Sequence, residues 1–350
     1  MSKPPFTVVL IVPTGIGAKI GGYAGDALPV ARSIAQISDN LITHPNVLNG
    51  AQLYWSLPNV YYVEGYGLDQ FAAKRWGLRP VHQNRVGLIL DQGIEPDLRL
   101  RHLQAAEAVK ATLGLNIGDY IVTDTPLGVQ LRTANSGASW GTIAHPDSLL
   151  RAAATLIDKG KVSAIAVVTR FPDEMATETL ANYRQGKGVD ALAGAEAIIS
   201  HLIVREFQIP CAHAPALSPL PIDASVSPRA AAEELGYTFL PCVLVGLSRA
   251  PQFTTKFDRN SDLQGSQVDA VVTPADACGG SSILNFSQSQ AQIIAVEDNE
   301  TTMAVSPEAL GLKTIRVRSY LEALGVLVTL RGGINPEALR VSISSLSGLN

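Results

Sequence analysis

The sequence predicts an α/β protein with a mostly parallel, doubly wound sheet in Rossmann-like layers, divided into two lobes. Short apolar runs rich in β-branched residues alternate with Ala- and Leu-rich stretches of helical period. Apolar residues make up 46% of the chain and charged residues only 17%, which suits sheets buried on both faces. The length of 350 residues exceeds what one ordinary core supports and therefore favours two lobes.

The apolar runs predict strands at residues 7–12, 60–63, 86–90, 120–123, 164–169, 241–246, 268–273, 292–296 and 314–317. The stretches of helical period predict helices at 26–37, 98–113, 147–159, 189–206, 228–235 and 281–287. Parallel strands joined through helices use right-handed crossovers, so we expect helices on both faces of the sheet.

Prolines determine where we divide the chain. Residues 209–226 contain Pro210, Pro215, Pro219 and Pro221, so they can form neither a regular helix nor a central strand. We therefore predict an N-terminal lobe, an extended crossing segment, a C-terminal lobe and a loosely held serine-containing tail. Their predicted bounds are 1–209, 210–227, 228–335 and 336–350.

Charge and cysteine content limit the partners and the compartment. The formal net charge is -4 and no Lys/Arg cluster is present, which disfavours nucleic acid and anionic membranes. No apolar run is long enough to span a bilayer. Cys211, Cys242 and Cys278 match neither a disulfide framework nor a metal motif. We expect a cytoplasmic protein whose partner is a small anionic metabolite, and we leave a homo-oligomer open.

A glycine-rich loop follows the first predicted strand, at residues 13–26. Glycine permits positive φ angles and close backbone approach, both of which help a loop to surround a phosphate or carboxylate. A tight connection that needs glycine only for packing is the alternative. The predicted anion contacts in this loop are Thr14, Gly15, Gly17, Gly21, Gly22 and Gly25.

The same loop matches neither of two common nucleotide-binding motifs. Ile20 stands where the dinucleotide motif has its third glycine, and Glu64 comes far too late to be its acidic residue. Lys19 is not preceded by glycine as in a phosphate-binding P-loop. A standard NAD or P-loop ATP site is therefore disfavoured. The cofactor and metal stay unknown, with Mg²⁺ left open because several acidic residues end predicted strands.

Further anion contacts are predicted in two other loops and at two arginines. Residues 132–142 and 274–282 are rich in small and hydroxyl residues and precede predicted helices. An arginine that follows a strand can clamp a carboxylate or phosphate, although such arginines also serve structural ion pairs. The residues concerned are Ser136, Gly137, Arg170, Arg249, Gly279, Gly280, Ser281 and Ser282.

Cys278 is the predicted nucleophile, because a helix N-terminus stabilises a thiolate and lowers the thiol pKa. Nearby Asp276, a further catalytic candidate, opposes that shift by like-charge repulsion. The base would be His44 or His145, which occur in matching Ile-x-His-Pro contexts and are predicted to share a cleft. The alternatives are a cysteine that only packs and a chance repeat of a helix-start signal.

Several of these segments resemble a conserved family of photosynthetic bacteria that is known only as a domain of unknown function. The resemblance rests on residues 14–18, 21–27, 43–46, 277–280 and 296–302, and it covers nearly the whole chain. It implies no activity.

Together the three loops predict an enzyme of the transferase or lyase class that acts on a phosphorylated or carboxylated small metabolite. Two alternatives stay open. One is a non-catalytic metabolite-binding or regulatory protein that uses the same loops. The other is an atypical NAD(P)-dependent oxidoreductase.

Overall fold

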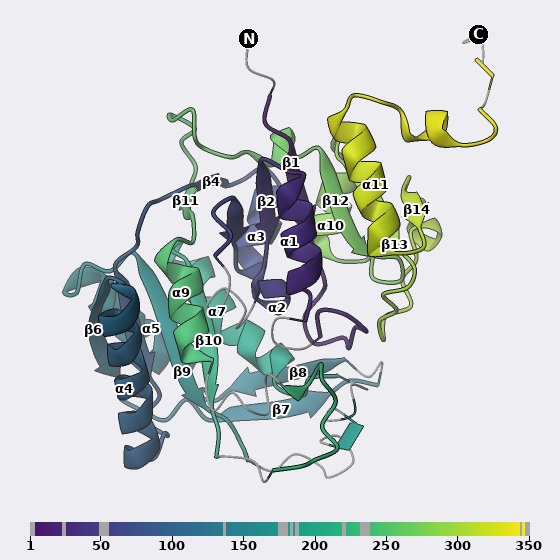
Figure 1. The fold of residues 1–350 in the computed structure, drawn as a ribbon. Coiled ribbons are helices and arrows are strands. Elements are labelled where there is room, and N and C mark those ends of the chain that lie inside the picture. The colour runs from purple at the N-terminus through teal and green to yellow at the C-terminus, as the bar shows by residue number, and fades with distance from the viewer. Residues whose placement is uncertain are drawn as a thin grey trace.

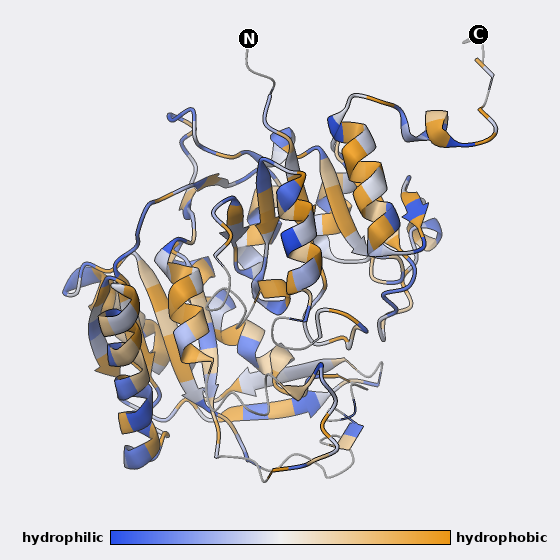
Figure 2. Ribbon diagram, viewed as in Figure 1, coloured by the Kyte–Doolittle hydropathy of each residue, from blue (hydrophilic) through white to orange (hydrophobic). Residues whose placement is uncertain are grey.

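The computed structural model describes residues 4–22, 26–48, 56–135, 138–173, 181–182, 185, 189–218, 222–231, 239–343 and 345–346. In this part of the chain, two parallel sheets are each covered by helices on both faces (Figure 1). The strands are mostly hydrophobic, whereas the outer surface of the long helix α4 is hydrophilic (Figure 2). The predicted α/β class with Rossmann-like layers is confirmed.

The first sheet has six parallel strands in the order β14-β13-β12-β1-β2-β3. Counted in chain order from the β3 edge, this is the 3-2-1-4-5-6 order of the doubly wound dinucleotide-binding fold. Its topological switch point, where ligands bind in such sheets, lies between β1 and β12. The strands are β1 (Thr7–Leu10), β2 (Asn40–Thr43), β3 (Val60–Tyr62), β12 (Ala270–Pro274), β13 (Gln292–Val296) and β14 (Ile315–Val317).

Helices on the two faces of the first sheet belong to different hydrophobic clusters. Side chains of α1 (Leu28–Gln36) and α11 (Tyr320–Arg331) pack with one face, and those of α3 (Gly65–Ala72) and α10 (Ser281–Ser287) with the other. Side chains of successive strand residues point to opposite faces, so the buried apolar residues of β1, β12 and β13 cover both faces of the sheet.

The second sheet has four parallel strands in the order β10-β9-β5-β6. Its strands are β5 (Val86–Leu90), β6 (Ile117–Val122), β9 (Ala164–Arg170) and β10 (Cys211–Ala216). The first strand in the chain, β5, lies between the second and the third, so the switch point of this sheet is between β5 and β9. The covering helices are α4 (Pro96–Leu113) and α9 (Leu240–Ser248) on one face, and α5 (Pro146–Asp158) and α7 (Ala193–Phe207) on the other.

The chain crosses between the sheets at residues 73–85 and 249–269, and the two crossings pair as an antiparallel ribbon. Its strands are β4 (Gly77–Arg79) and β11 (Gln252–Thr254). Arg79 binds Asp262 through two hydrogen bonds of 2.8 Å, and the Asn84 amide donates to two backbone carbonyls, of Leu247 and Ala250. These contacts tie the two crossings together.

A second antiparallel ribbon, β7 (Val129–Thr133) with β8 (Ser139–Ile143), lies below the first sheet in Figure 1 and beside the lower end of the second sheet. The remaining described elements are short. They are helix α2 (Pro45–Leu48) and the 3₁₀ turns η2 (Gly265–Gln267), η3 (Glu308–Leu310) and η4 (Pro336–Leu339).

The sheets divide the chain differently from the predicted lobes at 1–209 and 228–335. The first sheet takes strands from both ends of the chain, and the whole second sheet lies between β3 and β12. The proline-rich segment expected to cross between lobes contains β10, an edge strand. Pro215 is tolerated there because one side of an edge strand makes no ladder hydrogen bonds.

Other differences follow from short or uniformly apolar segments. The strand predicted at 241–246 is wrong, because these residues belong to helix α9, and a short apolar run cannot distinguish a strand from a buried helix. Helix α11 was missed because it is apolar on all sides and shows no helical periodicity. The helix predicted at 228–235 extends beyond the described residues.

Candidate functional site

The glycine-rich loop after β1 is packed between two distant segments. The N–H of Ser139, at the start of β8, donates to the Gly15 carbonyl at 2.8 Å. On the other side, the Thr302 N–H donates to the carbonyls of Ile16 and Gly17 at 2.9 and 3.0 Å. Gly15 and Gly17 have φ angles of 74° and 58°, a left-handed conformation that favours glycine. The glycines therefore serve the backbone path of this loop.

Several backbone N–H groups of the loop have no hydrogen-bond acceptor within the described residues. They include those of Gly15, Ile16 and Ala18, which are buried, and of Gly17, which is partly buried. Buried N–H groups in proteins are nearly always paired. Backbone turns that direct such groups to one side form concavities for anions. These N–H groups are therefore the backbone donors of this loop that no described residue uses.

His44, directly after β2, is 6% exposed and lies beside this loop. Its Nε2 accepts from the Val12 N–H at 3.1 Å, which assigns the proton of the neutral ring to Nδ1. Burial lowers the pKa of His44 to about 4, so the ring is neutral at pH 7. Among the described residues, none accepts a hydrogen bond from Nδ1. His44 thus has a neutral donor that is not used in the fold.

Glu64 follows β3, whose Tyr62 pairs with Thr43 at the end of β2. Its Oε2 caps helix α3 by accepting from the N–H groups of Tyr66 and Gly67, at 2.9 and 3.2 Å. No described residue donates to the other oxygen, Oε1. The residue is only 5% exposed, and burial raises its pKa to about 7. A carboxyl group that titrates near neutral pH can accept or donate a proton in catalysis.

Helix α7 brings more ionisable groups to the same strand ends. Glu196 in its first turn has Oε2 3.6 Å from Nε2 of His213 on β10. Burial chiefly, and then the charge of Glu196, raises the pKa of Asp190 just before the helix. Burial is also the main cause of the raised pKa of Tyr62 on β3, and the charge of Glu196 is among the smaller causes. Glu196 of α7 therefore lies close to Tyr62 of the first sheet.

The first turn of α7 also contacts the glycine-rich loop through β8. The Gly194 N–H donates to the Ser139 hydroxyl at 3.2 Å, and a Cβ built on Gly15 would lie 3.0 Å from that hydroxyl. The ends of β1, β2 and β3 therefore meet β8, β10 and α7 in one region. Neighbouring strands lie about 5 Å apart, so the loop after β1 and Glu64 after β3 are roughly 10 Å apart.

This region contains only part of the predicted site. Gly15, Gly17 and His44 lie in it. Glu64, Glu196 and His213 were missed as site residues, although Glu64 directly follows a predicted strand and this position was a usable signal. Among the described residues, no group of three or more His, Cys, Asp or Glu side chains is placed to hold a metal ion.

The prediction of Cys278 as a nucleophile needs correction. Its side chain is 0% exposed, with Sγ 3.7 Å from the carbonyls of Pro274 and Ala275. Burial raises its pKa to about 11, opposite to the expected lowering. Asp276 accepts from the N–H and hydroxyl of Thr301, and after burial its charge contributes to the raised thiol pKa, in the direction expected from like-charge repulsion. Cys278 packs as a small apolar residue.

His145 also lies elsewhere. It precedes α5, and its N–H donates to the Leu127 carbonyl at 3.2 Å, whereas His44 contacts Val12. The shared Ile-x-His-Pro context marks the start of a helix in both cases, because Pro45 begins α2 and Pro146 begins α5. None of the described contacts joins the two histidines.

The other predicted contacts serve packing or lie apart. A Cβ on Gly21 would lie 2.8 Å from the Val12 side chain, and one on Gly22 would lie 3.0 Å from the Ala18 carbonyl. Ser282 donates to Asp69 of α3. Exposed positions are Thr14, Gly279, Gly280 and Ser281, and Arg249 follows helix α9 rather than a strand and contacts Ser56. Gly25, Ser136 and Gly137 lie outside the described residues.

The switch point of the first sheet is bridged by residues 299–302. Thr301 binds Asp276, which follows β12, while Thr302 binds the loop after β1. Asn299 is fully buried and bonds to both the N–H and the carbonyl of Ile20, at 2.8 and 2.9 Å. This segment connects the two loops between which a dinucleotide would bind in a fold of this strand order.

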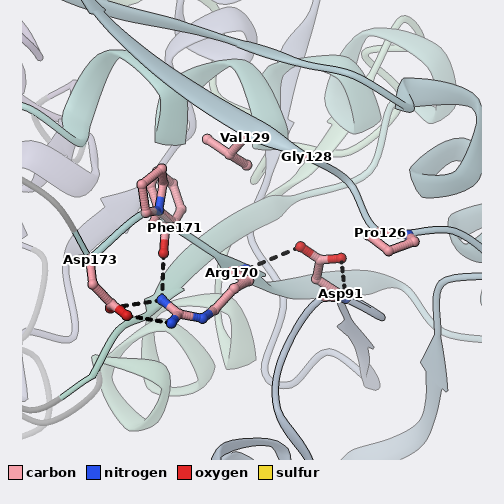
Figure 3. A pocket seen from close by; sticks show the side chains of 9 residues that line it. Asp91, Pro126, Gly128, Val129, Arg170, Phe171 and Asp173 are labelled. Carbon is pink, nitrogen blue, oxygen red and sulfur yellow. Dashed lines mark hydrogen bonds and ion pairs between the residues drawn. The ribbon is translucent and has the colours of Figure 1, made fainter.

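A pocket of about 300 Å³ lies at the switch point of the second sheet (Figure 3). Its wall includes Asp91 after β5, and Arg170 at the end of β9. Asp91 is 1% exposed and accepts from three backbone N–H groups, those of Gly93, Leu127 and Arg170. The other lining residues are Gly93, Pro126, Gly128, Val129, Phe171, Pro172 and Asp173.

None of the described helices is long and apolar enough to cross a membrane. Residues 7–340 match the family described as "Protein of unknown function (DUF3326)". A protein of Synechococcus sp. named "uncharacterized lipoprotein" is 59% identical over 345 residues, which cover 98% of this chain and 96% of that protein. No solved structure matches the chain. The expected membership in a family of unknown function is confirmed: the chain belongs to the DUF3326 family.

Proposed function

We propose that the protein is an enzyme that binds a phosphorylated or carboxylated small molecule at the ends of β1, β2 and β3 and transfers a proton during a lysis or group-transfer reaction. The observation that carries this proposal is Glu64, an almost fully buried carboxyl group with one unused oxygen and a pKa near 7. Such a group is suited to proton transfer at neutral pH.

The surrounding groups supply the other roles. The N–H groups of Gly15 and Gly17 bind the anionic group of the substrate. The neutral His44 ring donates from Nδ1 to an oxygen on which negative charge develops, and it does so without itself losing a proton. Glu64 then takes a proton from the substrate or returns one to it. His213, held between Glu196 and Ser200, is the second group available for proton transfer.

The two alternatives differ in what supports them. The chain crosses between the two sheets at residues 73–85 and 249–269, and a movement about these crossings would close the sheets on a ligand, which supports the non-catalytic metabolite-binding protein as the second candidate. The strand order of the first sheet suits an NAD(P) enzyme, but the bridge formed by residues 299–302 opposes that function. The buried free cysteines are in keeping with the proposed cytoplasmic location.

Binding is tested by following backbone amide resonances while inorganic phosphate or malonate is added. We expect the Gly15 and Gly17 resonances to shift, and Gly15→Ala to weaken binding at least tenfold because the new methyl group meets Ser139 and strains a left-handed backbone. Gly311→Ala is the matched control, since Gly311 has a φ of 65° and open space around its Cβ position. Shifts confined to other residues would contradict the anion site.

Proton transfer is tested by incubating the protein in D₂O with small carboxylates and phosphate esters and measuring deuterium incorporation at carbon. We expect one class of compound to exchange, with a rate that rises through about pH 7 as Glu64 ionises and that is lost in Glu64→Gln. Exchange that persists in Glu64→Gln would exclude Glu64 as the base. Anion binding without exchange would support the non-catalytic alternative.

A further inference from the structure

Of the four edge strands in the two described sheets, β6 is the one that is both long and free of proline. β3 and β14 have three residues each, and β10 contains Pro215, which lacks an N–H group. β6 has six residues, and no described strand pairs with its outer side, at the left of the molecule in Figure 1. Proteins usually shorten, charge or cover such an edge, because its free N–H and C=O groups can bind another strand.

The hydrogen bonds to β5 show which backbone groups of β6 point outward. The Thr123 N–H donates to the Leu90 carbonyl at 2.9 Å, so the backbone groups of Thr123 face β5. Because these groups alternate along a strand, those of Ile121 also face β5, whereas those of Tyr120 and Val122 point outward. No described residue hydrogen-bonds to these outward groups. A register shift interrupts the ladder just before Tyr120, so the regular free edge consists of residues 120–122.

The side chains along this edge are apolar on both faces of the sheet. The Tyr120 side chain is 57% exposed, and those of Ile121 and Val122 are partly buried. Val122 packs with the hydrophobic cluster under α4, and Ile121 packs with the cluster under α5. Tyr120 is two residues from Val122 and therefore lies on the same face as Val122. The edge can thus offer apolar contacts to a second strand on both faces.

We propose that β6 pairs with β6 of a second copy of this chain, in antiparallel orientation about a two-fold axis at Ile121. This register places each Tyr120 in a hydrogen-bonded pair with the partner's Val122, and Ile121 opposite the partner's Ile121. The outward groups of Tyr120 and Val122 then all have partners, and the two four-stranded sheets form one sheet of eight strands. Aromatic and β-branched residues opposite each other stabilise such pairs.

Charges beside the edge are complementary in the same register. The Asp119 side chain is 63% exposed and accepts from Arg85 at 3.2 Å. Arg151 is 58% exposed and binds Asp124, the residue after Thr123. The proposed pairing puts Asp119 opposite the partner's Thr123 and therefore beside the partner's Arg151. Each Asp119 gains a second guanidinium group, and no two like charges lie directly opposite each other.

Sedimentation velocity of the full-length protein tests self-association. We expect a monomer–dimer equilibrium with a Kd below about 100 μM. Tyr120→Pro should weaken it by roughly tenfold or more, because it removes one outward N–H from each copy and leaves the hydrogen bonds to β5 in place. Tyr120→Phe is the matched control and should leave it unchanged, because it keeps the N–H and the aromatic ring. Urea denaturation checks that both variants fold.

Cysteine substitution tests the register without proline. Residues opposite each other in a non-hydrogen-bonded antiparallel pair have Cα atoms about 4.5 Å apart, within disulfide range. Ile121→Cys should therefore form a covalent dimer on oxidation, since the natural cysteines are buried. Asp119→Cys should not, because its two copies would lie roughly 13 Å apart along the strands.

Three results would overturn the proposal. The first is a protein that stays monomeric at about 100 μM. The second is a dimer that Tyr120→Pro, folded, leaves as tight as in the natural protein, which would place the contact on another surface. The third is a failure of Ile121→Cys to cross-link more than Asp119→Cys.

Discussion

The two sheets of this protein have switch points of different character. In the first sheet, residues 299–302 connect the loops that follow β1 and β12, and the nearby His44 and Glu64 are buried and each keep one polar atom without a described partner. In the second sheet, the switch point keeps a pocket, and its charged groups are paired with one another or with backbone N–H groups. A shared parallel-sheet architecture thus does not determine where a site forms; the loops and their hydrogen bonds do.

Buried carboxyl groups show this contrast most clearly. Asp91 in the second sheet uses both oxygens to accept from three N–H groups. Glu64 in the first sheet uses one oxygen and leaves the other without a described donor. Asp91 therefore has a structural role, whereas Glu64 is held in place but keeps an oxygen for another partner.

The largest effect is expected from removing Asp91. Asp91→Ala leaves three N–H groups without their acceptor, and each buried unpaired group costs about 1–3 kcal/mol, so we expect a loss of about 4 kcal/mol in the free energy of unfolding. Urea denaturation measures this loss, and Asp97→Ala, an exposed change in the first turn of α4, is the control. A loss below about 1 kcal/mol would show that water replaces the carboxylate and that the contrast with Glu64 is small.

Replacing Glu64 is expected to raise the free energy of unfolding, by slightly less than the Asp91 replacement lowers it. Its pKa is about 7 in the folded protein and 4.5 in the unfolded chain, so the folded state holds a proton that the unfolded state has lost between these values. The contribution of Glu64 to the free energy of unfolding is therefore fully present below pH 4.5. It is lost as pH rises through 7, by about 3 kcal/mol in total.

Glu64→Gln keeps an acceptor for the α3 cap and removes this pH dependence. We expect the variant to be more stable than the natural protein by up to about 3 kcal/mol at pH 8, and nearly equal to it below pH 4.5. Urea denaturation at both pH values is the measurement, and Glu107→Gln is the control. Equal pH profiles for the variant and the natural protein would mean that Glu64 is paired or hydrated in the folded state.

The contribution of residues 299–302, which bridge the switch point of the first sheet, to stability should also be measurable. Asn299→Ala removes hydrogen bonds to Ile20 and to the Tyr320 hydroxyl in a fully buried position, and we expect it to cost about 2 kcal/mol. Thermal unfolding checks this value. If stability is unchanged and amide exchange of Thr301 and Thr302 is not accelerated, Asn299 does not hold the bridge in place.

The smallest expected effect concerns the cysteines. All three are buried, and burial raises the pKa of Cys278 to about 11 and that of Cys242 to about 12, so almost no thiolate forms at pH 7. Iodoacetamide should label the folded protein negligibly and the urea-unfolded protein fully, as measured by mass spectrometry. Rapid labelling of Cys278 in the folded protein would restore the nucleophile that the structure argues against.

The sequence by itself determined the α/β class, many of the strands and helices, and the glycine-rich loop, because apolar periodicity and glycine content are local properties. It also supported membership in a family whose function is unknown. Only the tertiary structure decided that strands from both ends of the chain form one sheet and that the other sheet is inserted between them, since strand pairing depends on contacts distant in sequence. The tertiary structure also decides which ionisable side chains are buried and which partners they have. It made Cys278 inert, left Glu64 with an unused oxygen, and occupied Arg170 with two carboxylates, although in the sequence each is simply an ionisable residue near the end of a strand.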